Sequence, residues 1–229
     1  MNPLAPEDYG DRIHFDEEDL KLMAQRQHPA QDYIRRLMGA SSMTDSYAMP
    51  QRYMRALDEV TLVYAKGSGK YGRGFAEASL KIRQEDPWFW SHFIGDPVMP
   101  GSQGQDGFAQ LGCLWCVFSR QIWGRARALG GSFEFVGQIL PTAERIFYRA
   151  DIKRFLKKKQ IVFFDGHLSV DHPDNVIYKF GETKAGFYSC TDLNLDPEPR
   201  NYYRPNWDLI REETLQWIDN AQKFYDHEA

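Results

Sequence analysis

A histidine, an aspartate and two glycines in one stretch of the sequence have the residue types that acid–base chemistry on a carbonyl compound requires. His92 lies in an apolar-flanked loop, and Asp106 follows fourteen residues later on the first turn of a hydrophobic stretch predicted to be a helix. Between them, Gly101 and Gly104 leave backbone N–H groups unobstructed beside a helix N-terminus, where free donors favour an anion or a developing oxyanion. A base, an acid and oxyanion donors are the set needed to remove a proton beside a carbonyl group.

The elements that must position these residues have an order typical of a sheet wrapped around one helix. The apolar stretch 108–118 predicts a buried helix, in which Ala109 and Gly112 allow neighbours to pack closely. Dense prolines and glycines predict a loop over 86–105. Runs of strand-forming residues bounded by turn signals predict strands over 53–65, 74–82, 125–136, 144–155, 160–171 and 175–188. We therefore predict an α+β fold.

The two ends of the chain differ from this middle part, which spans 47–190. Residues 1–46 are acidic and then carry a helical pattern interrupted at Pro29, so we expect a helical N-terminal extension. Residues 191–229 begin with a turn-rich segment and predict a C-terminal helix over 207–225. The apolar positions behind these two predictions are Leu20, Met23, Ile34 and Leu37 in the first segment and Trp207, Ile210, Trp217, Ala221 and Phe224 in the second.

The sequence around His92 resembles a known family. The run His92-Phe-Ile-Gly-Asp-Pro-Val-Met-Pro-Gly101, followed by Gly104-x-Asp106, is similar to the 3-hydroxydecanoyl-acyl-carrier-protein dehydratases of bacterial fatty-acid synthesis. The similarity continues through Arg127-Ala-Leu-Gly130 and Phe135-Val-Gly-Gln-Ile-Leu-Pro141 to Ile152-Lys-Arg154, and covers about 140 of the 229 residues. It implies a hot-dog fold, an antiparallel sheet wrapped around one long central helix.

The resemblance also implies a reaction and the residues that carry it. His92 would take the C2 proton of a (3R)-3-hydroxyacyl thioester, and Asp106 would help the hydroxyl leave as water. The backbone N–H groups of Gly101 and Ser102 would polarise the thioester carbonyl. The product is a trans-2-enoyl thioester, and we expect no cofactor and no metal. In this family the histidine faces the aspartate of the other subunit, so we expect a homodimer, or a heterodimer with a paralogous dehydratase.

Near the acyl tunnel, which also governs further isomerisation to a cis-3 product, the sequence departs from this family. Asp106 and the Ile-Gly-Asp-Pro run after His92 are closer to the members that isomerise. Polar or small residues near the tunnel, among them Ser102, Gly107 and Ala109, replace the larger or apolar residues usual there, so chain length and isomerisation stay open. The expected tunnel residues are Phe93, Val98, Pro100, Gln103, Gln105 and Gln110.

A basic run offers a docking surface for the acidic acyl carrier protein that would hold the substrate on its 4′-phosphopantetheine arm. Related dehydratases dock the carrier on basic residues near the tunnel mouth. Arg154, Lys158 and Lys184 match such positions here, and Lys157 and Lys159 of the same basic run complete the predicted docking surface. The alternative is that this run is only a solvated hairpin tip, and such electrostatic docking would weaken with salt.

Composition excludes several other classes of protein. Lys and Arg total 28 against 32 Asp and Glu, a net charge of −4, which argues against nucleic acid as a partner. No apolar stretch is long enough for a membrane span, and the first residues lack a secretory signal pattern, so we expect a cytoplasmic protein. Cys113 and Cys116 match C-x-x-C but lie mid-helix among apolar residues, which favours core packing over a metal or redox site.

Two other functions remain open from the sequence. The same fold serves acyl thioesterases, although the spacing of His92 and Asp106 is that of a dehydratase. The chain could also be a non-catalytic or obligate partner subunit of a heteromeric dehydratase, although both side chains are retained. We expect the lone Asp96 to be structural because Asp-Pro commonly opens turns.

Overall fold

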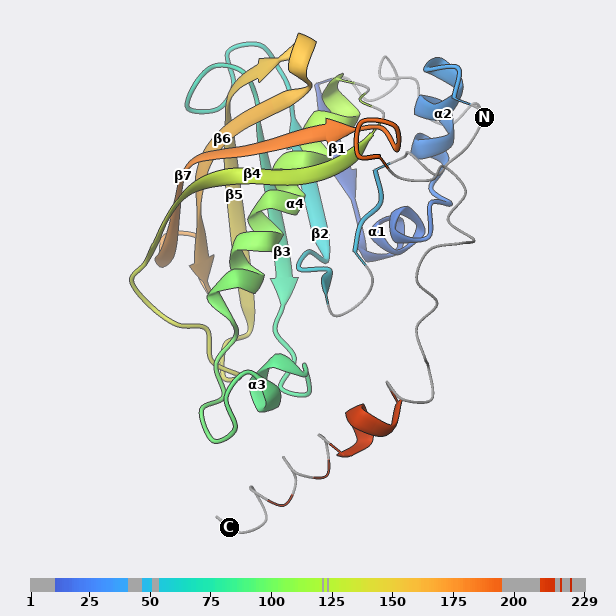
Figure 1. The fold of residues 1–229 in the computed structure, drawn as a ribbon. Coiled ribbons are helices and arrows are strands. Elements are labelled where there is room, and N and C mark those ends of the chain that lie inside the picture. Colours follow the sequence, from blue (N-terminus) through green and yellow to red (C-terminus); the bar gives the residue numbers. More distant parts are fainter. Residues whose placement is uncertain are drawn as a thin grey trace.

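The computed structural model describes residues 11–40, 47–50, 54–120, 122, 124–194, 211–216, 219 and 223 of the chain. In this part, seven strands form one antiparallel sheet in the order β1-β2-β3-β5-β6-β7-β4 (Figure 1). The strands are β1 (Arg12–Phe15), β2 (Glu59–Val63), β3 (Phe75–Lys81), β4 (Arg125–Phe135), β5 (Arg145–Leu156), β6 (Ile161–Val170) and β7 (Val176–Tyr188).

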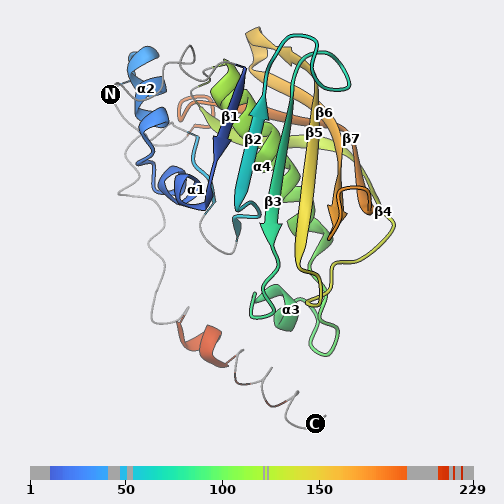
Figure 2. The ribbon, with the colours of Figure 1, turned by 180° about the vertical axis from the view of Figure 1, so that it is seen from behind.

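One long helix, α4 (Gly101–Arg120), lies against the inner face of this sheet and forms the centre of the core (Figure 1). The sheet can approach α4 closely because small residues lie at the contacts. A Cβ atom added at Gly107 would be 2.5 Å from the Tyr148 hydroxyl, and one added at Gly112 would overlap the Phe164 ring. The α+β prediction and the hot-dog architecture, an antiparallel sheet around one central helix, are confirmed. The opposite face of the sheet is not covered by α4 (Figure 2).

The six strands predicted from the sequence all form; five lie within about three residues of the expected bounds, but β2 begins only at Glu59, six residues after the start of the predicted strand over 53–65. The prediction of a continuous loop over 86–105 is wrong, because α3 (Trp88–Ser91) lies inside it and α4 begins at Gly101. Asp106 is therefore on the second turn of α4. Gly104 fits the start of this helix because it packs against the Tyr178 ring. A Cβ atom at this position would be only 2.8 Å from a ring carbon, which is too close. Tertiary packing thus overrides the low helix propensity of glycine.

The N-terminal segment contains helices α1 (Glu17–Ala24) and α2 (Pro29–Leu37), in agreement with the helical pattern and its interruption at Pro29. It also contributes β1, which the helical prediction missed. Only four residues alternate there, with Ile13 and Phe15 buried, and such a short alternation is decided by pairing with β2. In α2, Ile34 is buried but Leu37 is half exposed, at 51%.

The C-terminal segment is described only in part. Residues 211–216, 219 and 223 are helical, and the rest of the helix predicted over 207–225 lies outside the described residues, as do the apolar positions on which that prediction was based.

The predicted turn between β5 and β6 is a short 3₁₀ helix, η3 (Lys157–Lys159). No helix within the described ranges is both long and apolar enough to cross a membrane.

Candidate active site

His92 lies at the C-terminal end of α3, with its ring held by the loop that follows. The His92 Nδ1 atom is 3.2 Å from the carbonyl oxygen of Val98. Since a carbonyl oxygen only accepts hydrogen bonds, this contact assigns the ring proton to Nδ1 and leaves Nε2 as the basic atom of the neutral ring. Phe93 packs against the His92 ring, with 4.1 Å between the centroids, and is itself 55% exposed. The loop therefore presents His92 with the tautomer that a general base needs.

Asp106 projects from α4 into a half-buried environment in which its carboxylate is tied to Gln110. The Gln110 Nε2 atom donates a hydrogen bond of 2.6 Å to Asp106 Oδ2. Burial raises the pKa of the Asp106 carboxyl, and the hydrogen bond from Gln110 partly offsets this effect. A carboxyl whose pKa is raised holds its proton more readily at higher pH, so Asp106 has the electrostatic setting of a proton donor.

Gln110 is buried and links Asp106 to the segment before β2. Its Nε2 atom also donates to the carbonyl oxygen of Met54 at 2.7 Å, and its Oε1 atom accepts from the Ala56 N–H at 3.2 Å. All the polar atoms of this amide are therefore engaged, which fixes its orientation and that of the Asp106 carboxylate. Gln110 was predicted as a tunnel residue, and its contacts make it also a positioning residue for Asp106.

A pocket of about 230 Å³ opens beside Asp106, between α4 and the beginning of β4. Tyr47 closes part of it, because its hydroxyl donates to the carbonyl oxygen of Gln110 on α4 at 3.5 Å, and the Gln31 side chain on α2 donates to the Tyr47 carbonyl oxygen at 2.6 Å. The lining residues are Arg26, Tyr47, Ala48, Pro50, Asp106, Ala109, Gln110, Cys113, Arg125, Ala126, Arg127 and Ala128. Arg26 and Tyr47 were not expected from the sequence, where neither belongs to a recognisable motif.

The other residues predicted around the site lie near the start of α4. The backbone of Gly101 begins the helix, where N–H groups have no intrahelical acceptor, and the Phe135 ring of β4 lies over it, 3.5 Å from where a Cβ would be. Ser102 is exposed. Among the predicted tunnel residues, Gln110 alone lines the Asp106 pocket, and the other five lie elsewhere: Phe93 is exposed, Val98, Pro100 and Gln105 are half-buried, and Gln103 is buried.

His92 and Asp106 are not joined by a hydrogen bond within the described chain. The neighbouring strand β4 is unusual because it forms the edge of the sheet and is exposed on both faces from Arg127 to Phe135. Its large apolar side chains are open to solvent, with Leu129 42% and Phe135 49% exposed. An exposed, apolar edge strand is a ready surface for pairing with another chain.

Residues 49–180 match the FabA-like domain, and this span is more than half of the 229-residue chain. The chain belongs to the FabA-like family. The resemblance seen around His92 is thereby confirmed at the level of the family. Arg26 and Tyr47 lie before the matched FabA-like span, so the N-terminal segment adds residues to the pocket from outside it.

Solved structures with a similar fold share little sequence with this FabA-like chain. The dehydratase heterocomplex ApeI:P from Xenorhabdus doucetiae is 14% identical, with a TM-score of 0.48, covering 63% of this chain and 90% of that one. Zebra fish thioesterase superfamily member 2 is 10% identical, with a TM-score of 0.42, covering 69% and 95%. The Escherichia coli PaaI protein from the phenylacetic acid degradation operon is 12% identical, with a TM-score of 0.40, covering 74% and 95%. The identification depends on the family match and not on these likenesses.

The basic residues predicted to dock a carrier protein are brought together in part by the sheet. Arg154 pairs with Phe163 on the next strand, and Phe163 pairs in turn with Lys184. The Arg154 guanidinium lies 4.0 Å from the centre of the Phe163 ring. The three lysines of η3 are exposed at the adjoining tip, at the end of the FabA-like domain opposite α3 (Figure 1).

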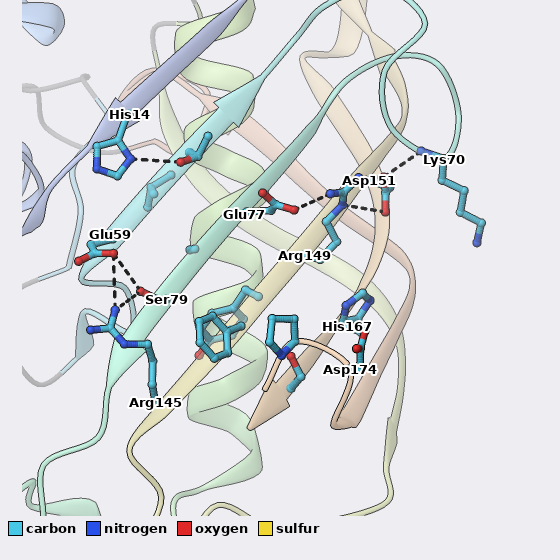
Figure 3. A pocket seen from close by; sticks show the side chains of 17 residues that line it. His14, Glu59, Lys70, Glu77, Ser79, Arg145, Arg149, Asp151, His167 and Asp174 are labelled. Atoms are coloured by element: carbon cyan, nitrogen blue, oxygen red, sulfur yellow. Dashed lines mark hydrogen bonds and ion pairs between the residues drawn. The ribbon is translucent and has the colours of Figure 1, made fainter. Parts of the chain in front are cut away.

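Another pocket, of about 730 Å³, lies away from these residues on the outer face of the sheet (Figure 3). Its charged side chains pair with one another across the strands. Arg149 bonds Glu77 at 2.6 Å and Asp151 at 3.2 Å, and Arg145 bonds the Ser79 hydroxyl at 2.7 Å and lies 3.5 Å from Glu59. His167, which lines the same groove, is half-buried.

The cysteines of the C-x-x-C pattern are core residues. Cys113 and Cys116 are both buried in α4, and burial raises the pKa of the Cys113 thiol to about 12. Such thiols are unreactive near neutral pH. Across the described ranges, no group of three or more His, Cys, Asp or Glu side chains is arranged to hold a metal ion.

Proposed function

We propose that this protein dehydrates a (3R)-3-hydroxyacyl thioester, carried by an acyl carrier protein, to the trans-2-enoyl thioester. The observation that carries the proposal is the pair of complementary groups in a FabA-like domain: His92 with its basic atom at Nε2, and Asp106 with a raised pKa. One is set to take a proton and the other to give one. When the surroundings of two groups shift their pKa values apart, one can act as the acid and the other as the base, so that an elimination reaction proceeds near neutral pH.

In the proposed reaction, Nε2 of His92 removes the proton from C2 of the substrate. The electron pair of that C–H bond forms the C2–C3 double bond, and the C3–O bond breaks. The departing hydroxyl takes the proton of the Asp106 carboxyl and leaves as water. Transfer of the proton from the His92 imidazolium to the Asp106 carboxylate, through solvent, restores both groups. The Gly101 N–H, at the start of α4, would stabilise negative charge on the thioester oxygen during proton removal.

The proposal includes a dimer in which His92 of one chain meets Asp106 of the other. Two features support it: the pair is not hydrogen-bonded within the described chain, and β4 beside the Asp106 pocket is an exposed apolar edge. Pairing of two β4 edges would bury Leu129 and Phe135 and create two equivalent sites. Arg154, Lys184 and η3 would then serve as the surface on which the carrier protein docks.

The test follows the mass of a carrier-bound 3-hydroxyacyl substrate, which loses one water on dehydration. We expect turnover by the wild type and a loss of about 10²–10⁴-fold in His92→Ala, because a positioned base contributes that much. His172→Ala, which removes an exposed histidine, is the matched control and should keep full activity. Equal traces for wild type and His92→Ala would refute the proposal. Release of free thiol without dehydration would point to a thioesterase instead.

A further inference from the structure

A separate pocket, of about 460 Å³, lies at the end of the molecule opposite α3. The C-terminal end of α4, the loop between β2 and β3 and the tip of the β5–β6 hairpin come together there (Figure 2). Its volume is within the range of small-molecule sites. The apolar part of its lining is Ile122, Ile152 and Phe155, and the polar part is Arg73, Ser119, Arg120 and Lys157. The lining thus contains three cations and no carboxylate.

The two arginines are placed at this pocket by packing on one buried side chain, Trp115 of α4. The Arg120 guanidinium lies 5.2 Å from the centre of the Trp115 ring. Arg73 precedes Gly74, which packs on the same ring, since a Cβ atom there would be 2.9 Å from a Trp115 ring carbon. The Gly74 carbonyl oxygen also accepts from the Ile152 N–H at 3.1 Å, which fixes the backbone beside Arg73 to β5. The fold therefore brings together two cations from separate parts of the chain.

The positive charge of this pocket is not neutralised by the part of the chain that the structure describes. There, none of its three cations forms an ion pair or a hydrogen bond with a carboxylate. Asp151, which anchors the loop between β2 and β3, is bonded instead to the Lys70 N–H at 2.9 Å and to Arg149 at 3.2 Å. The carbonyl groups at the C-terminus of α4 carry a partial charge of about −0.5, which is small beside three full positive charges. The pocket therefore favours an anion.

Ser119 adds a hydrogen-bonding group to the same lining. Its Oγ atom is buried and has no partner among the described residues. A buried hydroxyl is unfavourable in this state unless a ligand bonds to it. A phosphate monoester suits this set of groups, because it carries a charge of about −1.5 to −2 and three acceptor oxygens. Guanidinium groups match those oxygens with two parallel hydrogen bonds, whereas a carboxylate would neutralise only one of the three charges.

We propose that this pocket binds the phosphate group of a small molecule, with Arg73 and Arg120 bonded to the phosphate oxygens. Asp106 is fourteen residues before Arg120 on α4, about 21 Å along the helix axis at 1.5 Å per residue, so the phosphate lies apart from that reacting group. The phosphate has two possible sources: a free phosphorylated compound, or the 4′-phosphopantetheine arm of a carrier protein docked on the adjoining η3. Only the second source rests on the proposed function.

Calorimetric titration of the full-length protein with phenyl phosphate and with phenol tests this site without needing turnover. We expect the wild type to bind phenyl phosphate more tightly than phenol. Arg73→Gln and Arg120→Gln should each weaken phenyl phosphate about tenfold, because each removes one charge-assisted pair, and should leave phenol unchanged. Arg36→Gln, which changes an exposed arginine already paired with Asp32, is the control and should have no effect. Arg120→Lys keeps the charge and should retain most of the binding.

Two results would overturn the phosphate site. One is equal binding of phenyl phosphate and phenol by the wild type, and the other is equal binding of phenyl phosphate by the wild type and both glutamine variants. Thermal unfolding of each variant identifies any that has lost its fold. Phosphate-selective binding with no turnover of any hydroxyacyl thioester would sustain the site and defeat the dehydratase proposal. Turnover without phosphate-selective binding would do the reverse.

The two sources of the phosphate are separated by the holo and apo forms of an acyl carrier protein, which differ only in the phosphopantetheine arm. If Arg73→Gln weakens the holo form more than the apo form, the carrier arm supplies the phosphate. If it weakens phenyl phosphate but neither form of the carrier, the ligand is a free compound. Equal weakening of both forms with phenyl phosphate unaffected would assign Arg73 to the acidic surface of the carrier and refute the phosphate site.

Discussion

Two polar pockets of this protein contain arginines and carboxylates, yet only the smaller one has the properties of a reactive site. In the outer groove of about 730 Å³, the arginine side chains are satisfied by carboxylates on neighbouring strands, as with Arg149 between Glu77 and Asp151 (Figure 3). In the pocket of about 230 Å³ beside Asp106, the carboxyl is bonded to a neutral amide instead.

The difference shows that pocket size and the number of charges are poor guides to chemistry. Charges that neutralise each other across a sheet stabilise the fold and leave little capacity for a ligand. A carboxyl whose pKa is raised by burial, and whose hydrogen bond comes from a neutral amide, keeps its proton-donating capacity. Four measurements test whether the two pockets differ in this way.

The largest expected effect is on catalysis. Asp106→Asn should reduce kcat by about 10²–10⁴-fold, because the amide cannot donate the proton that the leaving hydroxyl needs. Asp151→Asn in the outer groove is the matched control. It should destabilise the fold by about 1–3 kcal/mol through weaker bonds to Arg149 and the Lys70 N–H, and leave kcat unchanged. Steady-state kinetics and chemical unfolding of both variants give the answer, and a similar kcat loss in both would remove the distinction.

A slightly smaller effect is expected from the edge strand that borders the Asp106 pocket. Leu129→Lys introduces a charge on the exposed β4 edge, which should prevent two chains from pairing. Mass measurement in solution should then find a monomer, and activity should fall about 10²-fold or more because His92 and Asp106 would no longer meet. Leu215→Lys changes another exposed leucine, away from β4, and should have no effect. A fully active monomer would contradict the two-chain site.

The pH dependence of stability offers a third test. Burial raises the pKa of Asp106 in the folded protein, so the native state holds this proton more tightly than the unfolded state. The stabilisation is therefore complete below the unfolded pKa and is lost as pH rises through the higher folded pKa. Relative to Asp106→Asn, wild-type unfolding free energy should fall as pH increases across this window. Parallel curves for the two proteins would mean that the carboxyl is not perturbed.

The smallest effect should come from the outer groove itself. Arg145→Gln removes a partly exposed ion pair with Glu59 and should cost only about 0–1 kcal/mol of unfolding free energy. Neither kcat nor KM should change. Chemical unfolding and kinetics on one preparation are sufficient, and a large kinetic effect would show that the outer groove takes part in function after all.

Much of the fold was predictable from local patterns. The strands 125–136, 144–155, 160–171 and 175–188 and the buried helix were found because long apolar alternations and turn residues are local signals. The start of α4 was missed, since Pro100, Gly101 and Gly104 resemble a loop in the sequence, and only the fold places the Phe135 ring over Gly101 and the Tyr178 ring against Gly104. β1 was missed because a four-residue strand depends on the neighbour with which it pairs.

Local patterns in the sequence were therefore sufficient for six of the strands, the central helix and the resemblance to the family, and they selected His92 and Asp106 as the residues to test. What surrounds these two residues was visible only in the folded chain. Gln110 is bonded to Asp106, the Val98 carbonyl oxygen sets the tautomer of His92, and Arg26 arrives at the pocket from a segment eighty residues before Asp106. The physical reason is that periodicity and turn chemistry act between near neighbours in the chain. Desolvation, hydrogen-bond geometry and unbalanced charge depend on which distant residues the fold places together.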